Sequence, residues 1–185
     1  MTDFSRCWKK GLVLFAVLLL CSLEGAAQER QAGTVQSPKG LGLFYERAGD
    51  SPQYASRFLF FLDFDGILQG ETRRPGFLLG YLRHCYLPVY SLADGTEMDF
   101  FYGPGAVVGA VRDGKDFQGP VVALRGAVGL RFNFPERPFS LAFGWSADLG
   151  LHMQRVAGEN TNVLRLYRGG LRRAWLPEIH LSYRF

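Results

Sequence analysis

The segment Phe139–Met153, FSLAFGWSADLGLHM, alternates with a period of two over its whole length. Its odd positions hold large apolar side chains and one alanine, and its even positions hold serine, alanine, glycine, aspartate and histidine. Successive side chains of a β-strand point to opposite faces. The segment therefore predicts a strand with one apolar face and one small or polar face.

Three further segments repeat this alternation. Residues 122–134 place apolar side chains on even positions, with Arg125 and Arg131 among the odd ones. In residues 56–68 the apolar even positions, such as Phe58, alternate with Arg57, Asp63 and Asp65, although Leu59 and Phe61 make the second face partly apolar. Residues 175–185 alternate in the same way. Together with turn-like Gly, Pro, Asp and Asn clusters, the pattern predicts strands near residues 39–47, 55–68, 75–90, 97–112, 119–133, 139–154, 161–168 and 174–185.

The length of these strands favours a membrane barrel over a soluble β-sandwich. They run to about 12–15 residues, whereas strands of globular proteins typically have about 5–6 and tilted membrane strands need about 9–11. A face of glycine and charge would make a poor sandwich core but can fill a narrow barrel lumen. A closed barrel also satisfies every backbone hydrogen bond within lipid. The sequence therefore predicts an all-β fold, a closed antiparallel transmembrane β-barrel of about eight strands.

The N-terminal region predicts a cleavable signal peptide. Lys9 and Lys10 precede the apolar run Leu12–Cys21, and small residues lead to a cleavage site after Ala27. The apolar run is shorter than the roughly 20 residues of a spanning helix. An N-terminal anchor and a lipoprotein cut before Cys21 are the alternatives, the second disfavoured because Leu20 is not small. The expected organisation is a signal peptide over 1–27, a disordered lead-in over 28–38 and an outer-membrane barrel over 39–185.

Cleavage leaves Cys85 as the one cysteine, so no disulfide can form within the mature chain. It also leaves 18 basic and 15 acidic residues, a net charge of +3 that is dispersed along the chain and does not indicate nucleic-acid binding. The adjacent residues His84 and Cys85 face opposite ways, and Asp148 lies about 13 Å from His152 along a strand. We therefore expect no cofactor and no metal.

The C-terminal residues Pro177–Phe185, PEIHLSYRF, resemble the final strand by which barrel-assembly machinery recognises outer-membrane barrels. The run Phe100–Ala106, FFYGPGA, followed by Val111–Asp113, is similar to a strand motif of small porin-like barrels. The Ala27–Gln28 junction resembles that of secreted proteins from Bacteroidota-type bacteria. The chain thus resembles the small porin-like outer-membrane barrels of Gram-negative bacteria. That resemblance implies contact with outer-membrane lipids and with the assembly machinery through Phe185, but no particular activity.

One constellation could carry chemistry. Glu178, His180 and Ser182 are spaced two apart and share the lumen face, and an esterase needs these residue types. Lipid A 3-O-deacylase, an eight-stranded barrel enzyme, is similar in having a His-x-Ser pair and a Glu. It differs in that its active groups face the membrane and its Glu follows the pair. The alternative role is structural, within a polar lumen network that we expect to include Asp63, Asp65, Arg125, Arg131, Asp148 and His152.

The favoured function is therefore an integral outer-membrane barrel with a structural or loop-mediated interaction role and no enzymatic activity. A lipid-modifying hydrolase is the first alternative and a narrow solute pore the second. Eight strands enclose an interior just wide enough for side chains to fill, so a large channel is not expected.

Overall fold

The computed structural model describes residues 30–49, 51, 53–68, 70, 75–92, 95–113, 118–134, 137–155 and 162–185, and the expected signal peptide lies outside them. The elements are β1 (Arg30–Ser37), β2 (Gly40–Ala48), β3 (Tyr54–Asp63), α2 (Asp65–Leu68), β4 (Gly76–Ser91), β5 (Glu97–Val111), β6 (Gly119–Asn133), β7 (Phe139–Arg155), β8 (Asn162–Leu166), α3 (Arg168–Arg173) and β9 (Pro177–Arg184). Among the described residues, no helix has the length and apolar composition that crossing a membrane requires.

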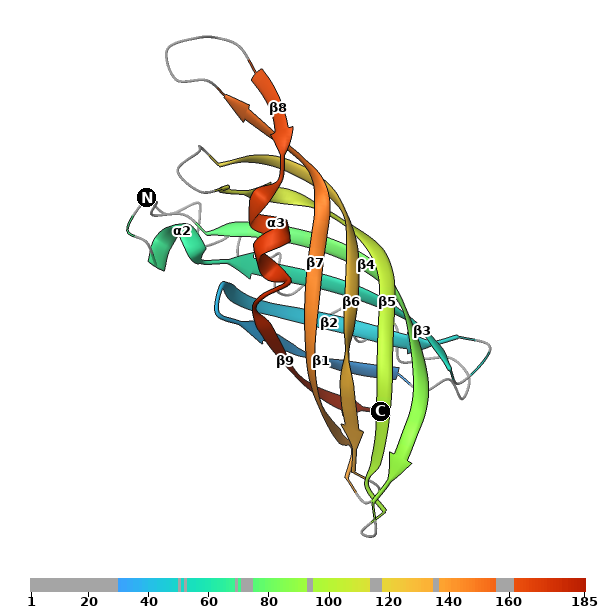
Figure 1. Cartoon of the computed structure of the whole chain (residues 1–185). Helices are drawn as coiled ribbons and strands as arrows, with labels where there is room; N and C mark the ends of the chain where they lie inside the picture. The colour runs from blue at the N-terminus through green and yellow to red at the C-terminus, as the bar shows by residue number, and fades with distance from the viewer. Residues whose placement is uncertain are drawn as a thin grey trace.

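Eight of the strands form a closed antiparallel barrel (Figure 1). They follow the order β6-β5-β4-β3-β2-β1-β9-β7, and pairing between β6 and β7 closes the ring. The predicted fold class, a closed antiparallel barrel of about eight strands, is confirmed. We call the end that carries α3 and the connections after β1, β3 and β5 the α3 end, and the opposite end, with Phe185, the C-terminal end.

The composition of the ring differs from the prediction at its first strand. The expected disordered lead-in over residues 28–38 is wrong for Arg30–Ser37, which form β1 between β2 and β9. Neither face of β1 is strongly apolar, because its inward positions are Gln31, Gly33 and Val35 and its outward ones are mostly polar. The segment therefore carries no amphipathic signal. It is ordered by backbone hydrogen bonds to two strands that would otherwise have free edges.

The eighth barrel strand also departs from the prediction. The segment expected over 161–168 contains β8, which among the described strands pairs only with the end of β7 and lies outside the ring. The chain then turns through α3 and returns to the wall as β9, three residues later than the expected start at 174. The strand expected over 55–68 ends at Asp63 and gives way to α2.

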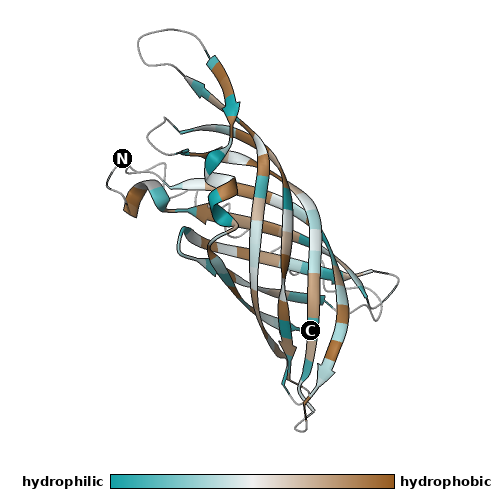
Figure 2. Cartoon of the chain, viewed as in Figure 1, coloured by the Kyte–Doolittle hydropathy of each residue, from teal (hydrophilic) through white to brown (hydrophobic). Residues whose placement is uncertain are grey.

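Hydrophilic and hydrophobic residues alternate along the strands (Figure 2), and their exposure places large apolar side chains on the outer face and the charged ones mostly in the lumen. Leu124 on the outer face of β6 is 68% exposed, whereas its inward neighbour Arg125 is 4% exposed. Glu46 and Asp148 are likewise buried in the lumen, at 2% and 0% exposure. In a soluble protein large apolar side chains are mostly buried and charged ones mostly exposed, so the positions of Leu124, Arg125, Glu46 and Asp148 are the reverse of that pattern.

Inward glycines create the space in which lumen aromatic rings pack. A Cβ atom built on Gly103 would lie 2.2 Å from Cδ2 of His84. Atoms built on Gly129 and Gly144 would lie 2.6 and 3.0 Å from the Phe101 ring. His84 and Phe101 stack with ring centroids 5.1 Å apart. Glycine in the FFYGPGA motif therefore allows a ring from the neighbouring strand to lie flat against the wall.

Candidate functional site in the barrel lumen

Near the C-terminal end, the carboxylate of Glu46 is the centre of a buried polar cluster. Arg57 Nε donates to its Oε2 at 2.6 Å and the Tyr86 hydroxyl donates to its Oε1 at 2.7 Å. Gln31 also donates to Oε1, and His84 Nδ1 lies 3.4 Å from Oε2. Cross-strand register explains part of the cluster, because Glu46 lies opposite Arg57 in β3 and opposite Gln31 in β1.

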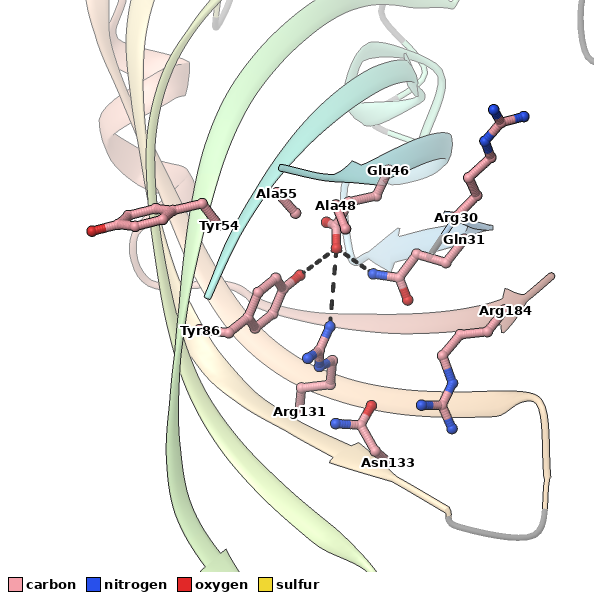
Figure 3. Close-up of a pocket in the computed structure, with 10 residues that line it drawn as sticks. All are labelled: Arg30, Gln31, Glu46, Ala48, Tyr54, Ala55, Tyr86, Arg131, Asn133 and Arg184. Atoms are coloured by element: carbon pink, nitrogen blue, oxygen red, sulfur yellow. Dashed lines mark hydrogen bonds and ion pairs between the residues drawn. The ribbon is translucent and has the colours of Figure 1, made fainter. Parts of the chain in front are cut away.

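A second carboxylate, Asp99 on β5, joins this cluster through Arg131. Arg131 Nη2 donates to Asp99 Oδ2 at 2.7 Å, and Asn133 Nδ2 donates to the same oxygen at 2.7 Å. Figure 3 shows Gln31, Tyr86 and Arg131 directed at the Glu46 carboxylate. The cavity there has a volume of about 40 Å³. A cavity needs a volume of at least about 10–15 Å³ to hold one buried water, so this cavity has room for a few waters and not for a large ligand.

The three residues of the possible catalytic triad all face the lumen, and Ser182 and His180 share partners with the Glu46 cluster. The Ser182 hydroxyl lies 3.0 Å from Ser140 Oγ and donates to Gln31 Oε1 at 3.1 Å. His180 Nδ1 lies 3.0 Å from Arg57 Nη1. Among the described side chains, no hydrogen bond joins Ser182 to His180. A serine nucleophile is typically within about 2.6–3.2 Å of its base; here the hydrogen bonds of Ser182 go to Ser140 and Gln31 instead.

Glu178, the third residue of the possible triad, contacts both Ser146 and His180. Its Oε1 accepts from Ser146 Oγ at 2.7 Å, and its Oε2 lies 3.5 Å from His180 Nε2. Among the residues that the structure describes, no group of three or more His, Cys, Asp or Glu side chains is arranged to hold a metal ion.

At the α3 end, Arg173 of α3 joins opposite walls of the barrel. Its Nη2 donates to Asp63 Oδ2 on β3 at 2.9 Å, and its Nε lies 3.6 Å from Asp148 Oδ2 on β7. Arg125 holds Asp148 from the neighbouring strand through two bonds of 2.6 and 2.7 Å. The Arg173 guanidinium also lies 4.4 Å from the centre of the Phe61 ring. Its side chain is 2% exposed.

The backbone of α3 is fixed by residues from other connections. Both Asp113 carboxylate oxygens accept backbone N–H groups, from Arg168 at 2.8 Å and Gly169 at 2.7 Å. Lys39 Nζ donates to the Gly169 carbonyl at 3.4 Å. A carboxylate at the first turn of a helix satisfies N–H groups that have no partner within the helix. Gly170 lies against Asp148, since a Cβ there would be 2.5 Å from its carbonyl oxygen.

Together these contacts connect opposite walls of the lumen. Glu46 on β2 and Arg131 on β6 lie half-way around the ring from each other, yet their side chains approach to 4.0 Å. Asp63 and Asp148 also lie on opposite strands, β3 and β7, and Arg173 bridges them. The lumen is thus crossed by ion pairs at two levels.

The residues expected in the polar network lie at different places in the barrel. Asp63, Arg125, Arg131 and Asp148 take part in the ion pairs described above. His152 faces inward, with Nε2 3.1 Å from the Val111 carbonyl oxygen. Asp65 lies in α2 and pairs with Lys39 at 3.4 Å. The main members that sequence analysis did not single out are Glu46, Tyr86, Asp99 and Arg173. Asp99 lies between two outward apolar residues and could have been found by alternation, whereas Glu46 is followed by the exposed Arg47. Arg173 lies on a helix that the sequence pattern did not predict.

The fold and the lumen together define a closed eight-stranded antiparallel β-barrel with a largely apolar exterior and a lumen that holds buried ion pairs together with apolar side chains. Among solved structures, the N-terminal β-barrel domain of OprF from Pseudomonas aeruginosa is similar, with 8% sequence identity and a TM-score of 0.49. The match covers 85% of this chain and 96% of that domain. No protein-family model matches the chain, and no curated protein matches it. Function must therefore be inferred from the chain's own residues.

Proposed function

We propose that the chain is an integral outer-membrane β-barrel protein with a side-chain-filled lumen, whose role is structural or is exerted through its connections. The observation that carries this proposal is the inverted polarity of the barrel. Apart from β1, its outward rows are largely apolar, whereas its ion pairs lie inside. Such a surface is unfavourable in water, since soluble monomers rarely expose contiguous apolar patches beyond a few hundred Å². It suits the hydrocarbon region of a bilayer.

Two features of the ends support the same role. The connections after β2, β4 and β6 have five residues each, and those after β3 and β5 have twelve and seven. At the α3 end only the connection after β1 is short, with two residues, and α3 precedes the last barrel strand. Outer-membrane barrels have short periplasmic turns and longer extracellular loops. We therefore assign the C-terminal end to the periplasmic side and the α3 end to the cell exterior. The signal peptide over 1–27 supplies the route of export.

Localisation and membrane insertion test the proposal directly. The full precursor, expressed in a Gram-negative cell, should be recovered in the outer-membrane fraction and resist extraction by urea. Its folded form should migrate differently from the boiled form in a denaturing gel, because a closed barrel in detergent unfolds only on heating. Recovery as a soluble periplasmic protein would overturn the proposal.

The two alternatives receive less support from the geometry. A hydrolase of the lipid A deacylase type would need Ser182 and His180 bonded to each other and facing the membrane, whereas both face the lumen and bond to other residues. A solute pore would require the two levels of ion pairs to separate.

A further inference from the structure

The helix α3 presents one side to the lumen and the other to the surroundings of the barrel. Its buried residues are Gly169, Gly170 and Arg173, and Arg173 extends into the lumen. Arg168 and Arg172 are exposed and therefore lie on the outer side of the helix. Residues four apart on a helix are neighbours on one face, with Cβ atoms about 5–6 Å apart. Two positive charges are thus held close together on the outer surface of the barrel.

The acidic side chains near α3 bond to other groups. Asp113 accepts two backbone N–H groups of the first turn of the helix, and Asp65 pairs with Lys39 at 3.4 Å. The two lumen carboxylates bind Arg173 on the buried side. The described bonds of these carboxylates therefore go to the helix backbone, to Lys39 and to the lumen. Like charges four residues apart destabilise a helix, so an anion bound between the two exposed arginines would stabilise α3.

The strands that adjoin α3 in the wall, β7 and β9, have apolar outer faces. Their outward positions within residues 139–153 and 177–183 hold no charged side chain. Trp175, just after the helix, is 86% exposed, and Leu171, four residues before it, is exposed as well. The outer side of α3 therefore combines two cations with apolar side chains, and it continues into a surface suited to hydrocarbon.

The level of α3 along the wall corresponds to the outer boundary of a bilayer. At the C-terminal end, Phe139 and Tyr183 pack with ring centroids 5.2 Å apart, as in the aromatic girdle at a membrane interface. A tilted strand crosses the hydrocarbon in about 9–11 residues, which counted from the start of β7 ends at about residues 147–149. The Tyr167 N–H donates to the Gly150 carbonyl at 2.9 Å, so α3 begins beside that point of β7 (Figure 1). The exposed side of the helix is thus at the depth of lipid head groups.

We propose that the outer side of α3 binds a phosphate of lipid A, the phosphorylated glycolipid of the outer leaflet, through Arg168 and Arg172. Arginine forms charge-assisted, often bidentate hydrogen bonds with phosphate. The acyl chains extend toward the middle of the barrel along β7 and β9, where Phe143 and Ile179 are paired in register and exposed. This inference rests on the proposed function, because it takes the outer face to lie in a bilayer and the α3 end to face the cell exterior.

The test measures lipid binding and membrane insertion separately. The mature chain is folded into phosphatidylcholine vesicles, with insertion scored by the heat-dependent gel shift. It is then released in mild detergent and titrated under native mass spectrometry with lipid A, with the same lipid A after removal of its phosphates, and with phosphatidylglycerol. The α3 variant is Arg168→Gln with Arg172→Gln, and Arg172→Gln alone is measured beside it. The matched control is Arg83→Gln with Arg137→Gln, which removes the same charge from exposed positions toward the C-terminal end.

We expect one lipid A to bind the wild type about tenfold more tightly than its dephosphorylated form, which corresponds to about 1.4 kcal/mol. The α3 variant should lose this preference while it still inserts, because both phosphate ligands are removed. The single variant should retain part of the preference, and the control should keep all of it.

A wild type that inserts but shows no preference for the phosphates would overturn the site. So would a preference that survives in the α3 variant or falls equally in the control. Phosphatidylglycerol binding as tight as that of lipid A, or equally effective competition by inorganic phosphate, would overturn the assignment of lipid A. Failure of the wild type to insert into vesicles would instead overturn the proposed function.

Discussion

Placing an arginine on the outer face of β6 tests whether lipid or water surrounds the barrel. Leu124 is 68% exposed and lies two residues from Gly126, the midpoint of β6. Its register partners, Ala106 in β5 and Leu149 in β7, are uncharged. Leu124→Arg would therefore bring a charge to the middle of the apolar band with no opposite charge beside it.

The expected magnitude depends sharply on the surroundings. At the midplane of a bilayer, an outward arginine destabilises a barrel by about 2–4 kcal/mol. At an exposed position of a soluble protein, a surface substitution usually changes stability by less than about 0.5 kcal/mol. At about 1.4 kcal/mol per factor of ten, the bilayer effect is a change of about thirty-fold to several hundred-fold in the folding equilibrium.

The assay is denaturant unfolding of the mature chain in phosphatidylcholine vesicles, followed by the heat-dependent gel shift and by tryptophan fluorescence. The matched control is Leu92→Arg, the same chemical change at a residue 44% exposed in the connection between β4 and β5. Near the interface an arginine costs about 0–1 kcal/mol. If Leu124→Arg were no more destabilising than Leu92→Arg, the outer face would not lie in hydrocarbon and our interpretation of its polarity would be wrong.

Three further predictions concern the lumen. Ser182→Ala should leave the mass spectrum of lipid A from expressing cells unchanged, because the Ser182 hydroxyl bonds to Ser140; an acyl chain that is lost with the wild type and retained with the variant would establish the hydrolase instead. In planar bilayers the wild type should show no steady conductance. Arg173→Met removes the bridge between Asp63 and Asp148, so it should destabilise the barrel by about 3–5 kcal/mol and produce intermittent openings. Equal conductance of the two proteins would contradict a lumen closed by α3. Gly103→Ala should destabilise the barrel by about 1–3 kcal/mol through overpacking against His84, and unfolding in vesicles should show partial recovery when His84→Ala is added; an unchanged Gly103→Ala variant would show that the ring can move aside.

The strands that sequence analysis located well are those with an apolar outer face. The boundaries expected for β6, 119–133, match the structure, and β7 extends one residue beyond the expected 139–154. Alternation is strong there because one side must avoid water while the other lines the lumen. β1 has no such contrast, since Gln31 faces inward and Thr34 and Gln36 face outward. Its place in the wall follows from pairing with β2 and β9, which is a property of the closed ring and not of the segment.

The partners within the lumen could not be predicted for a geometric reason. Alternation shows that Arg131 points inward, but it does not show which strand lies across the lumen from β6. The closed order of eight strands places β2 opposite, and only then does Glu46 become a neighbour, at 4.0 Å. In the same way, Asp63 and Asp148 lie on opposite walls and are joined because α3 brings Arg173 between them.

The helix α3, inserted between β8 and β9, connects this geometry to function. β7 is seventeen residues long, and β8 and β9 pair with its two ends while leaving its central residues 146–150 to face the α3 segment. A continuous strand would close the wall evenly, but it would leave the carboxylates of Asp63 and Asp148 buried with one fewer cation. Burying a charge without a partner costs several kcal/mol. Arg173 of the inserted helix therefore compensates the negative charge of the lumen at the α3 end, and the same contact crosses the lumen. For this reason we expect changes at Arg173 to alter both the stability of the barrel and the conductance of its lumen.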